Sequence, residues 1–219
     1  MIFLLKDIGF TGYDAVIAFA LMTIVYLLAI TSHEYAHAYA ATKCGDDTAR
    51  LSGRLTLNPI AHIDLLGALC FLIAGFGWAK PVPINPLKFK KYRSGIAKVS
   101  LAGVTANLIL CFISSFFYVL FSNILVADNA FSVYTVFFFQ FSMIFNALLF
   151  VFNLLPIYPL DGFNYLSTKL KPNSKFIQFN ARYGYIILLI LAATGVINYL
   201  LVYVQYIYWP FVKLFELLF

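Results

Sequence analysis

Charged residues are scarce in this chain. Only 11% of its 219 residues are Asp, Glu, Lys or Arg, whereas about a quarter are charged in a soluble globular domain. Hydrophobic residues make up 63% of the chain, and the mean hydropathy is +0.88. A water-soluble fold needs more polar surface than this. The sequence therefore predicts one domain, over residues 1–219, embedded in a lipid bilayer.

Paired cysteines and a continuous basic face are also missing. Cys44, Cys70 and Cys111 are isolated, which argues against a disulfide scaffold and a thiolate metal site. The net charge of +6 comes from Lys and Arg residues beside apolar runs, so we expect no nucleic-acid partner. The N-terminus shows no small-residue cleavage site near the first apolar run, and we expect no removable signal peptide.

Long apolar runs are what the sequence has in abundance. Crossing a hydrocarbon core of about 30 Å takes about 20 helical residues. Four runs are long enough, near 14–42, 96–121, 131–155 and 183–204. A shorter run at 65–78 suits a re-entrant segment, and the tail 205–219, broken by Pro210, suits an interfacial helix or a fifth crossing. The expected fold class is an all-α polytopic membrane protein.

The distribution of basic residues predicts the orientation. Residues 99–168 contain no Lys or Arg, whereas nine lie between Lys43 and Lys98 and four between Lys169 and Arg182. The positive-inside rule places both basic segments in the cytoplasm and the turn near Asp128 outside. The run 65–78 then has cytoplasmic residues on both sides, so it must enter and leave the membrane on one face.

Residues near 48–60 have a different pattern. Leu and β-branched residues alternate with polar ones in RLSGRLTLNPI, which predicts a short β-hairpin. Bare backbone edges are not tolerated in lipid, so we expect such a hairpin to be covered by protein or to line a wet cavity.

One acidic residue lies inside the first predicted span. Charged residues in spans are costly and are usually functional. Glu34 belongs to His33-Glu34-Tyr35-Ala36-His37, an H-E-x-x-H motif. Residues four apart share one face of a helix, so both imidazoles can bind one Zn²⁺ while Glu34 acts on a metal-bound water. The motif predicts a catalytic zinc site, with one ion per chain.

Catalytic zinc needs a third protein ligand and one open position. The candidates are His62, Asp64 and Asp161. Asp161 follows an apolar run in a turn where Pro156 and Pro159 break the helix and can carry the carboxylate inward. A carboxylate buried in the membrane at the depth of His33 and His37 needs a cation beside it. This requirement favours Asp161 over His62 as the third ligand.

Five segments together resemble the site-2 protease family of intramembrane zinc metalloproteases, in its compact bacterial branch without PDZ or CBS domains. They are HEYAHAYAA (33–41), GRLTLNPIAHID (53–64), GWAKPVPINP (77–86), AGVTANL (102–108) and NLLPIYPLDG (153–162). One departure is Val104, at a position where the family usually has Pro.

The resemblance implies roles for individual residues. His33, His37 and Asp161 would be the metal ligands, and Glu34 the catalytic acid and base. Residues expected near the substrate or an oxyanion are two asparagines at family positions and four residues of the predicted hairpin: Asn107, Asn153, Gly53, Arg54, Leu55 and Thr56.

Together these patterns predict a zinc-dependent intramembrane endopeptidase. Its expected substrate is a transmembrane protein, cleaved within a membrane segment near the cytoplasmic face. The expected location is the bacterial inner membrane, as a multi-pass protein. Two alternatives are a divalent-metal transporter that uses the same three ligands and a catalytically inactive membrane-binding homologue. A transporter has no use for a general base, so the glutamate between the two histidines argues against transport. The intact Glu34 argues against an inactive homologue.

Overall fold

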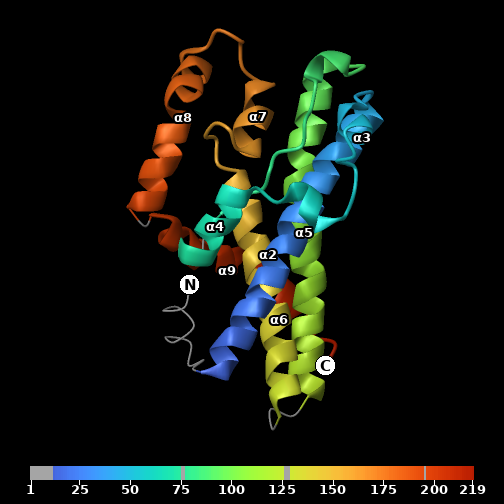
Figure 1. Ribbon diagram of the computed structural model, residues 1–219, viewed down its shortest axis with the longest axis vertical. Coiled ribbons are helices and arrows are strands. Elements are labelled where there is room, and N and C mark those ends of the chain that lie inside the picture. The colour runs from blue at the N-terminus through green and yellow to red at the C-terminus, as the bar shows by residue number, and fades with distance from the viewer. Residues whose placement is uncertain (1–11, 75–76, 126–128, 195) are drawn as a thin grey trace.

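Three long helices form the central bundle of the molecule. They are α2 (Tyr13–Cys44), α5 (Tyr92–Ile124) and α6 (Ala130–Asn153), which lie side by side in the computed structural model (Figure 1). Each is long and apolar enough to cross a membrane. The protein is therefore a mostly helical membrane protein, as predicted. The structure describes residues 12–74, 77–125, 129–194 and 196–219.

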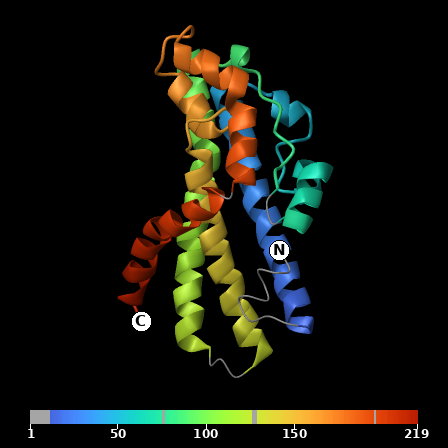
Figure 2. The same cartoon turned by 90° about the vertical axis from the view of Figure 1, so that its left-hand side faces the viewer.

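Shorter elements surround this bundle. At one end α3 (Thr48–Leu51) follows α2, and α7 (Asp161–Ser167) packs against α5 (Figure 1). The 3₁₀ helices Pro59–His62 and Pro86–Lys88 lie in the connections between α3 and α5. Figure 2 shows α4 (Leu65–Ala74) and α9 (Val196–Glu216) on opposite sides of the bundle.

Helix α2 packs through a continuous buried stripe. The stripe begins with Ala18, Met22, Val25 and Ala29, which are spaced by three or four residues and so share one helical face. His33 and His37 continue this spacing and are buried too. Packing of α2 in the bundle therefore turns both imidazoles away from lipid.

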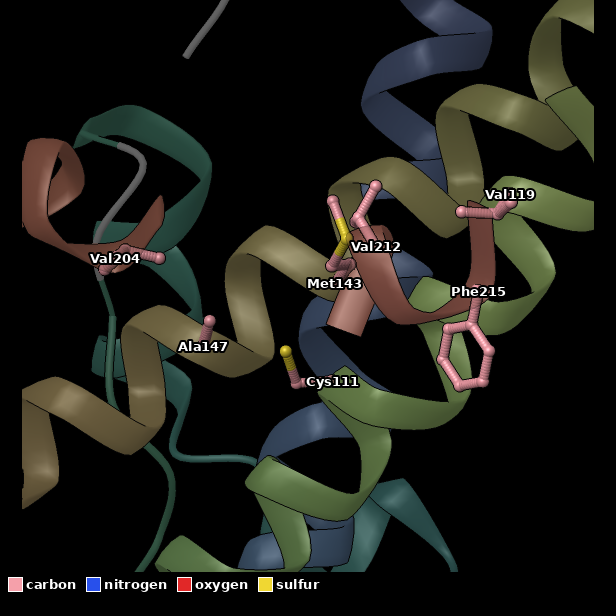
Figure 3. Packing of buried hydrophobic residues seen from close by; sticks show 7 residues of the cluster. All are labelled: Cys111, Val119, Met143, Ala147, Val204, Val212 and Phe215. Atoms are coloured by element: carbon pink, nitrogen blue, oxygen red, sulfur yellow. The ribbon is translucent and has the colours of Figure 1, made fainter. Parts of the chain in front are cut away.

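The C-terminal helix α9 packs against α5 and α6. Its buried side chains lie in one cluster with residues of both helices (Figure 3), made up of Cys111, Val119, Met143, Ala147, Val204, Val212 and Phe215. Pro210 lies inside α9. The predicted break in the tail is therefore absent from the described structure, because α9 continues through this proline.

The fourth predicted span is not supported. Residues 183–204 fall on two helices, α8 (Lys175–Ala193) and α9, which begins at Val196. Residue 195 lies outside the described residues. The apolar character of the run does not change at this boundary, so hydropathy alone predicts one helix where the chain makes two.

The two ends of the run 65–78 meet beside α2. Ile63 and Ala79 form an antiparallel bridge, and the amide of Lys80 donates to the carbonyl of His62 (2.9 Å). A Cβ atom on Gly67 would lie 2.2 Å from the carbonyl oxygen of Trp78, so glycine is needed for this close return. The re-entrant path fits this closure, although residues 75–76 lie outside the described part of the chain.

The structure does not show the hairpin expected near 48–60. Residues Thr48–Leu51 are the helix α3, and residues 52–58 form turns and irregular backbone, with no strand anywhere in the described ranges. The alternation has another cause: Leu55 packs against the Ala38 and Val82 cluster, while the polar Arg54 reaches the backbone of Lys80. No partner strand lies alongside, so alternation here marks a single packed loop.

Asp46 ties the end of α2 to the segment that leads into α5. It is fully buried and accepts hydrogen bonds from the amide of Thr48 (3.0 Å) and from the amide of Asn85 (2.6 Å). Burial raises the pKa of this carboxyl, but the hydrogen bonds from Thr48 and Asn85 outweigh it and bring the pKa below its ordinary value. The ionised carboxylate thus fixes residue 85 against α2.

Two expectations concern residues that the structure does not describe. Residues 1–11 hold the N-terminus, for which no signal peptide is expected, and residues 126–128 include the turn at Asp128. Both expectations stay predictions.

Candidate metal centre

His33, His37 and Asp161 converge between α2 and the start of α7. The Nε2 atoms of the two histidines lie 3.0 Å apart, and each lies 3.3 Å from Oδ2 of Asp161. The three side chains are 11%, 9% and 12% exposed, so the group is nearly closed to its surroundings. Ligand atoms about 2.0–2.1 Å from a tetrahedral zinc ion lie about 3.3 Å from one another, so the spacing suits one ion.

Hydrogen bonds at the far ring nitrogens orient both imidazoles. Nδ1 of His37 lies 2.8 Å from the carbonyl oxygen of Val99, which can only accept, so this nitrogen carries the proton. Nδ1 of His33 lies 2.7 Å from Oδ1 of Asn107 and donates in the same way. In the neutral rings, each Nε2 therefore presents a lone pair toward Asp161.

The donor set fits a divalent metal ion. Three acceptor atoms that face one another repel unless a cation lies between them. Oδ2 of Asp161 is buried and has no hydrogen-bond donor among the described residues. Two imidazole nitrogens and one carboxylate oxygen are a known ligand set of catalytic zinc. Among the described residues, these three form the one such group within ligand range.

Two glycines allow this convergence. A Cβ atom on Gly103 of α5 would lie 2.5 Å from Nε2 of His37 and 2.7 Å from Nε2 of His33. A Cβ atom on Gly162 would lie 2.1 Å from the carbonyl oxygen of Leu154, at the end of α6. The first glycine leaves space at the metal-binding atoms. The second lets α7 begin directly against α6, which sets the position of Asp161.

Glu34 lies on the next face of α2, beside an irregular segment at residues 79–85. Its Oε2 accepts a hydrogen bond from the amide of Val82 (2.9 Å). Arg54 holds the same segment, because its Nη2 donates to the carbonyl oxygens of Lys80 (2.6 Å) and Pro81 (3.4 Å). The glutamate of the motif is thus bonded to this segment rather than to a neighbouring helix.

The two predicted asparagines lie in different surroundings. Asn107 is fully buried, and its Nδ2 donates to the carbonyl of Ala29 (3.3 Å) and to Oδ1 of Asn146 (2.9 Å) while Oδ1 faces His33. Asn153 donates to the carbonyl of Leu149, one turn earlier in α6 (3.0 Å). The structure therefore brings Asn107 to the metal ligands and gives Asn153 a bond within its own helix.

The rival ligand candidates lie outside the converging group. His62 is fully buried, and its Nε2 bonds the carbonyl oxygen of Thr56 (2.8 Å). Asp64 accepts from the amide of Gly67 (2.8 Å) at the start of α4. Both side chains serve the connection between α3 and α4. The structure brings Asp161, and neither of these two residues, to His33 and His37.

The remaining predicted substrate residues form the turn after α3. Gly53 has a φ of +69°, a left-handed conformation that favours glycine. Leu55 is packed against the cluster described above, and the Thr56 hydroxyl accepts from the amide of Asn58 (3.2 Å). The Thr56 contact is internal to the loop, whereas Leu55 packs against α2 and Val82.

Sequence reasoning missed three features of this site. They are the gap left by Gly103, the Val82 amide at Glu34, and the second buried amide, Asn146. Asn146 carried a usable signal, because a polar side chain inside the apolar run 131–155 is costly unless it has partners. The other two depend on how distant segments approach, which residue type alone does not reveal.

The fold and site together define a helical membrane protein with a candidate metal centre of two histidines and one carboxylate. Two relatives of this chain have names that describe zinc metalloproteases. The chain is 44% identical over 182 residues to "Putative zinc metalloprotease YwhC" of Bacillus subtilis (strain 168), covering 82% of this chain and 83% of that protein. It is 30% identical over 203 residues to "Putative zinc metalloprotease Rip2" of Mycolicibacterium smegmatis (strain ATCC 700084 / mc(2)155), covering 88% and 73%. No family model and no solved structure matches the chain.

The chain belongs to the zinc metalloprotease family of these two relatives. The similarity to the first relative extends over most of both chains and not over the motif alone.

Proposed function

We propose that this chain is an intramembrane zinc endopeptidase of the site-2 protease type, which cleaves a transmembrane segment of a membrane-protein substrate near the cytoplasmic face. One observation carries the proposal. Two histidines and a carboxylate converge, with Nε2–Oδ2 distances of 3.3 Å, in a bundle of three membrane-length helices. A membrane location for a hydrolytic ligand set implies a substrate that is itself in the membrane.

Each residue of the motif has a distinct part in this mechanism. His33, His37 and Asp161 hold the ion. When bound, zinc supplies Lewis acidity that makes a water molecule acidic and polarises the scissile carbonyl. Glu34 accepts the proton of that water and returns it to the leaving amine. The amide of Val82 holds Oε2 of this carboxylate during the transfer.

The substrate must present an unwound segment. Peptide groups in a helix are bonded to one another and sterically closed, so a transmembrane helix has to unfold locally before attack. A strand at residues 53–56 could pair with such a segment, but this loop forms no strand. Gly53, Arg54, Leu55 and Thr56 stay predicted substrate contacts, and Asn153 a predicted contact of the substrate or oxyanion.

The distribution of charge supports a cytoplasmic site. The metal centre lies toward the end of the bundle that carries α3, α7 and the start of α5 (Figure 1). That end holds Lys43, Lys91 and Arg93, whereas residues 99–168 contain no basic residue. By the positive-inside rule this end faces the cytoplasm. The proposed location is the inner membrane of a bacterial cell.

The test is the substitution Glu34→Gln in purified protein. We expect zinc at one ion per chain in both wild type and variant, because the three ligands remain. Cleavage of a single-pass membrane peptide should fall at least about 100-fold, because the proton acceptor is lost. Glu216→Gln is the matched control, since Glu216 is the chain's other glutamate and pairs with Lys213 near the end of α9.

The same experiment separates the alternatives. Wild-type protein without bound zinc would refute the metal centre. A Glu34→Gln variant that cleaves within about tenfold of wild type would refute the general-base role. Zinc flux into proteoliposomes without cleavage would indicate the transporter, and bound zinc without either activity would indicate the inactive homologue.

A further inference from the structure

We propose that Asn146 of α6 is a positioning residue for the metal centre. It fixes the side-chain amide of Asn107, which in turn makes His33 present Nε2 to the metal. The inference rests on the proposed ligand role of His33. It deepens that role by adding a residue, on a third helix, that touches neither metal nor substrate.

A backbone carbonyl sets the direction of the hydrogen-bond chain. The carbonyl oxygen of Ser142 can only accept, and it takes a hydrogen bond from Nδ2 of Asn146 (2.9 Å). The amide of Asn146 therefore points its Oδ1 toward α5, where it accepts from Nδ2 of Asn107 (2.9 Å). Asn107 must then face His33 with Oδ1, at 2.7 Å from Nδ1. Each orientation follows from the one before.

The last step decides the chemistry of the ligand. An acceptor at Nδ1 keeps the proton on this nitrogen of neutral His33, so Nε2 has a free lone pair. If the amide of Asn107 turned over, its NH₂ group would face Nδ1 and favour the opposite tautomer. A proton on Nε2 would then occupy the position of the metal bond.

Both amides of this hydrogen-bond chain are buried, so a missing hydrogen bond would be costly in free energy. Asn107 is 0% exposed and Asn146 is 2% exposed. A buried amide that loses its hydrogen-bond partner is destabilising, so both orientations are held strongly while every partner is present. Without Asn146, Nδ2 of Asn107 keeps only the longer bond to the carbonyl of Ala29 (3.3 Å). That single contact is a weaker restraint against turning over.

A simpler role for Asn146 is interhelical adhesion between α5 and α6. Adhesion and positioning differ in what they predict. Loss of adhesion lowers stability whatever stands at position 107. Loss of positioning affects metal binding only while residue 107 is an amide, which can turn either its accepting oxygen or its donating NH₂ group toward His33.

The test uses Asn146→Leu, a substitution of similar volume without an acceptor. Zinc affinity is measured by competition with a chelator in the purified protein, and we expect it to weaken about 10- to 100-fold. Ser142→Ala is the matched control. It removes the hydroxyl bonded to Ser114 (2.8 Å) and near Nδ2 of Asn146 (3.4 Å), but keeps the carbonyl that orients Asn146. Its zinc affinity should stay within about threefold of wild type.

Rescue distinguishes positioning from adhesion. In Asn107→Asp both carboxylate oxygens accept, so His33 meets an acceptor in either orientation. We therefore expect Asn146→Leu to change zinc affinity by less than about threefold in the Asn107→Asp background. An equal loss in both backgrounds would overturn the proposal, as would an unchanged affinity in the Asn107 background.

A second readout follows the tautomer directly. Nitrogen-15 NMR of the three histidines in the metal-free protein should show His33 protonated at Nδ1 in wild type and a mixture of tautomers in Asn146→Leu. An unchanged His33 spectrum overturns the proposal.

Should Asn146→Leu not fold, Asn146→Asp replaces it, because it keeps an acceptor for Asn107. A tenfold loss of zinc affinity in Asn146→Asp overturns the proposal. Wild type that binds no zinc refutes the metal centre itself, a separate outcome.

Discussion

Two neighbouring faces of α2 carry the two halves of the proposed chemistry, and they are held in different ways. The ligand face, with His33 and His37, is bonded to Asn107 and Val99 of the helix α5. The acid–base face, with Glu34, is bonded to the irregular segment at 79–85 through one amide. Helix packing thus fixes the two histidine ligands, whereas the segment 79–85 fixes Glu34.

Because the two faces are held by different parts of the chain, metal binding and cleavage can be separated by substitution. A change on the ligand side should alter metal affinity first and cleavage as a consequence. A change on the loop side should alter cleavage while the metal stays bound.

The largest effect is expected for Asp161→Ala. The substitution removes the ligand that α7 brings to the two histidines, so most bound zinc and all measurable cleavage should be lost. The measurement is metal stoichiometry of the purified variant together with peptide cleavage. His62→Gln is the control, because the His62 side chain bonds the carbonyl of Thr56 by Nε2 and lies outside the converging group, and it should keep both properties within about threefold. Full zinc occupancy in Asp161→Ala, with loss in His62→Gln, would reverse the ligand assignment.

A smaller loss is expected for Gly103→Ala. Its Cβ would lie 2.5 Å from Nε2 of His37, so an imidazole or the backbone of α5 must shift. Overpacking of this kind costs about 1–3 kcal/mol, and we expect zinc affinity to fall about 10- to 100-fold. The control is Gly95→Ala on the same helix, where the added Cβ would lie 2.4 Å from the ring of Phe89 and away from the ligands. If both variants lose stability and keep their zinc affinity, Gly103 serves packing only.

The ligand side was also the more predictable half of the molecule. Apolar runs located α2, α5 and α6 because lipid demands long helices from any sequence. Helical spacing put His33 and His37 on one face, and the Pro-rich break carried Asp161 to them. Local rules were enough for each of these steps.

The loop side depends on contacts that local rules do not describe. Alternation at 53–56 resembles a strand, but Arg54 and Leu55 are placed by distant neighbours at Lys80 and Val82. The amide at Glu34 comes from a residue between two prolines, where no strand or helix is expected. The break between α8 and α9 was missed because both sides are equally apolar.

Arg54 offers the finest test of the separation. Its guanidinium donates to the carbonyls of Lys80 and Pro81, and the peptide group of Pro81 continues into the Val82 amide that holds Glu34. Arg54→Met keeps the apolar stem and removes these donors. We expect the segment to lose its restraint and Glu34 to sample other positions.

The expected result is a drop in kcat/KM of about 3- to 10-fold, which corresponds to the net contribution of one ordinary hydrogen bond, about 1 kcal/mol. Zinc affinity should not change, because neither His33 nor His37 is bonded to the loop. Arg50→Met is the matched control. Arg50 lies on α3, is largely exposed and pairs with Asp47, and such pairs contribute little. If zinc affinity fell together with cleavage in Arg54→Met, the segment 79–85 would also support the metal ligands. The two faces of α2 would then act as one unit.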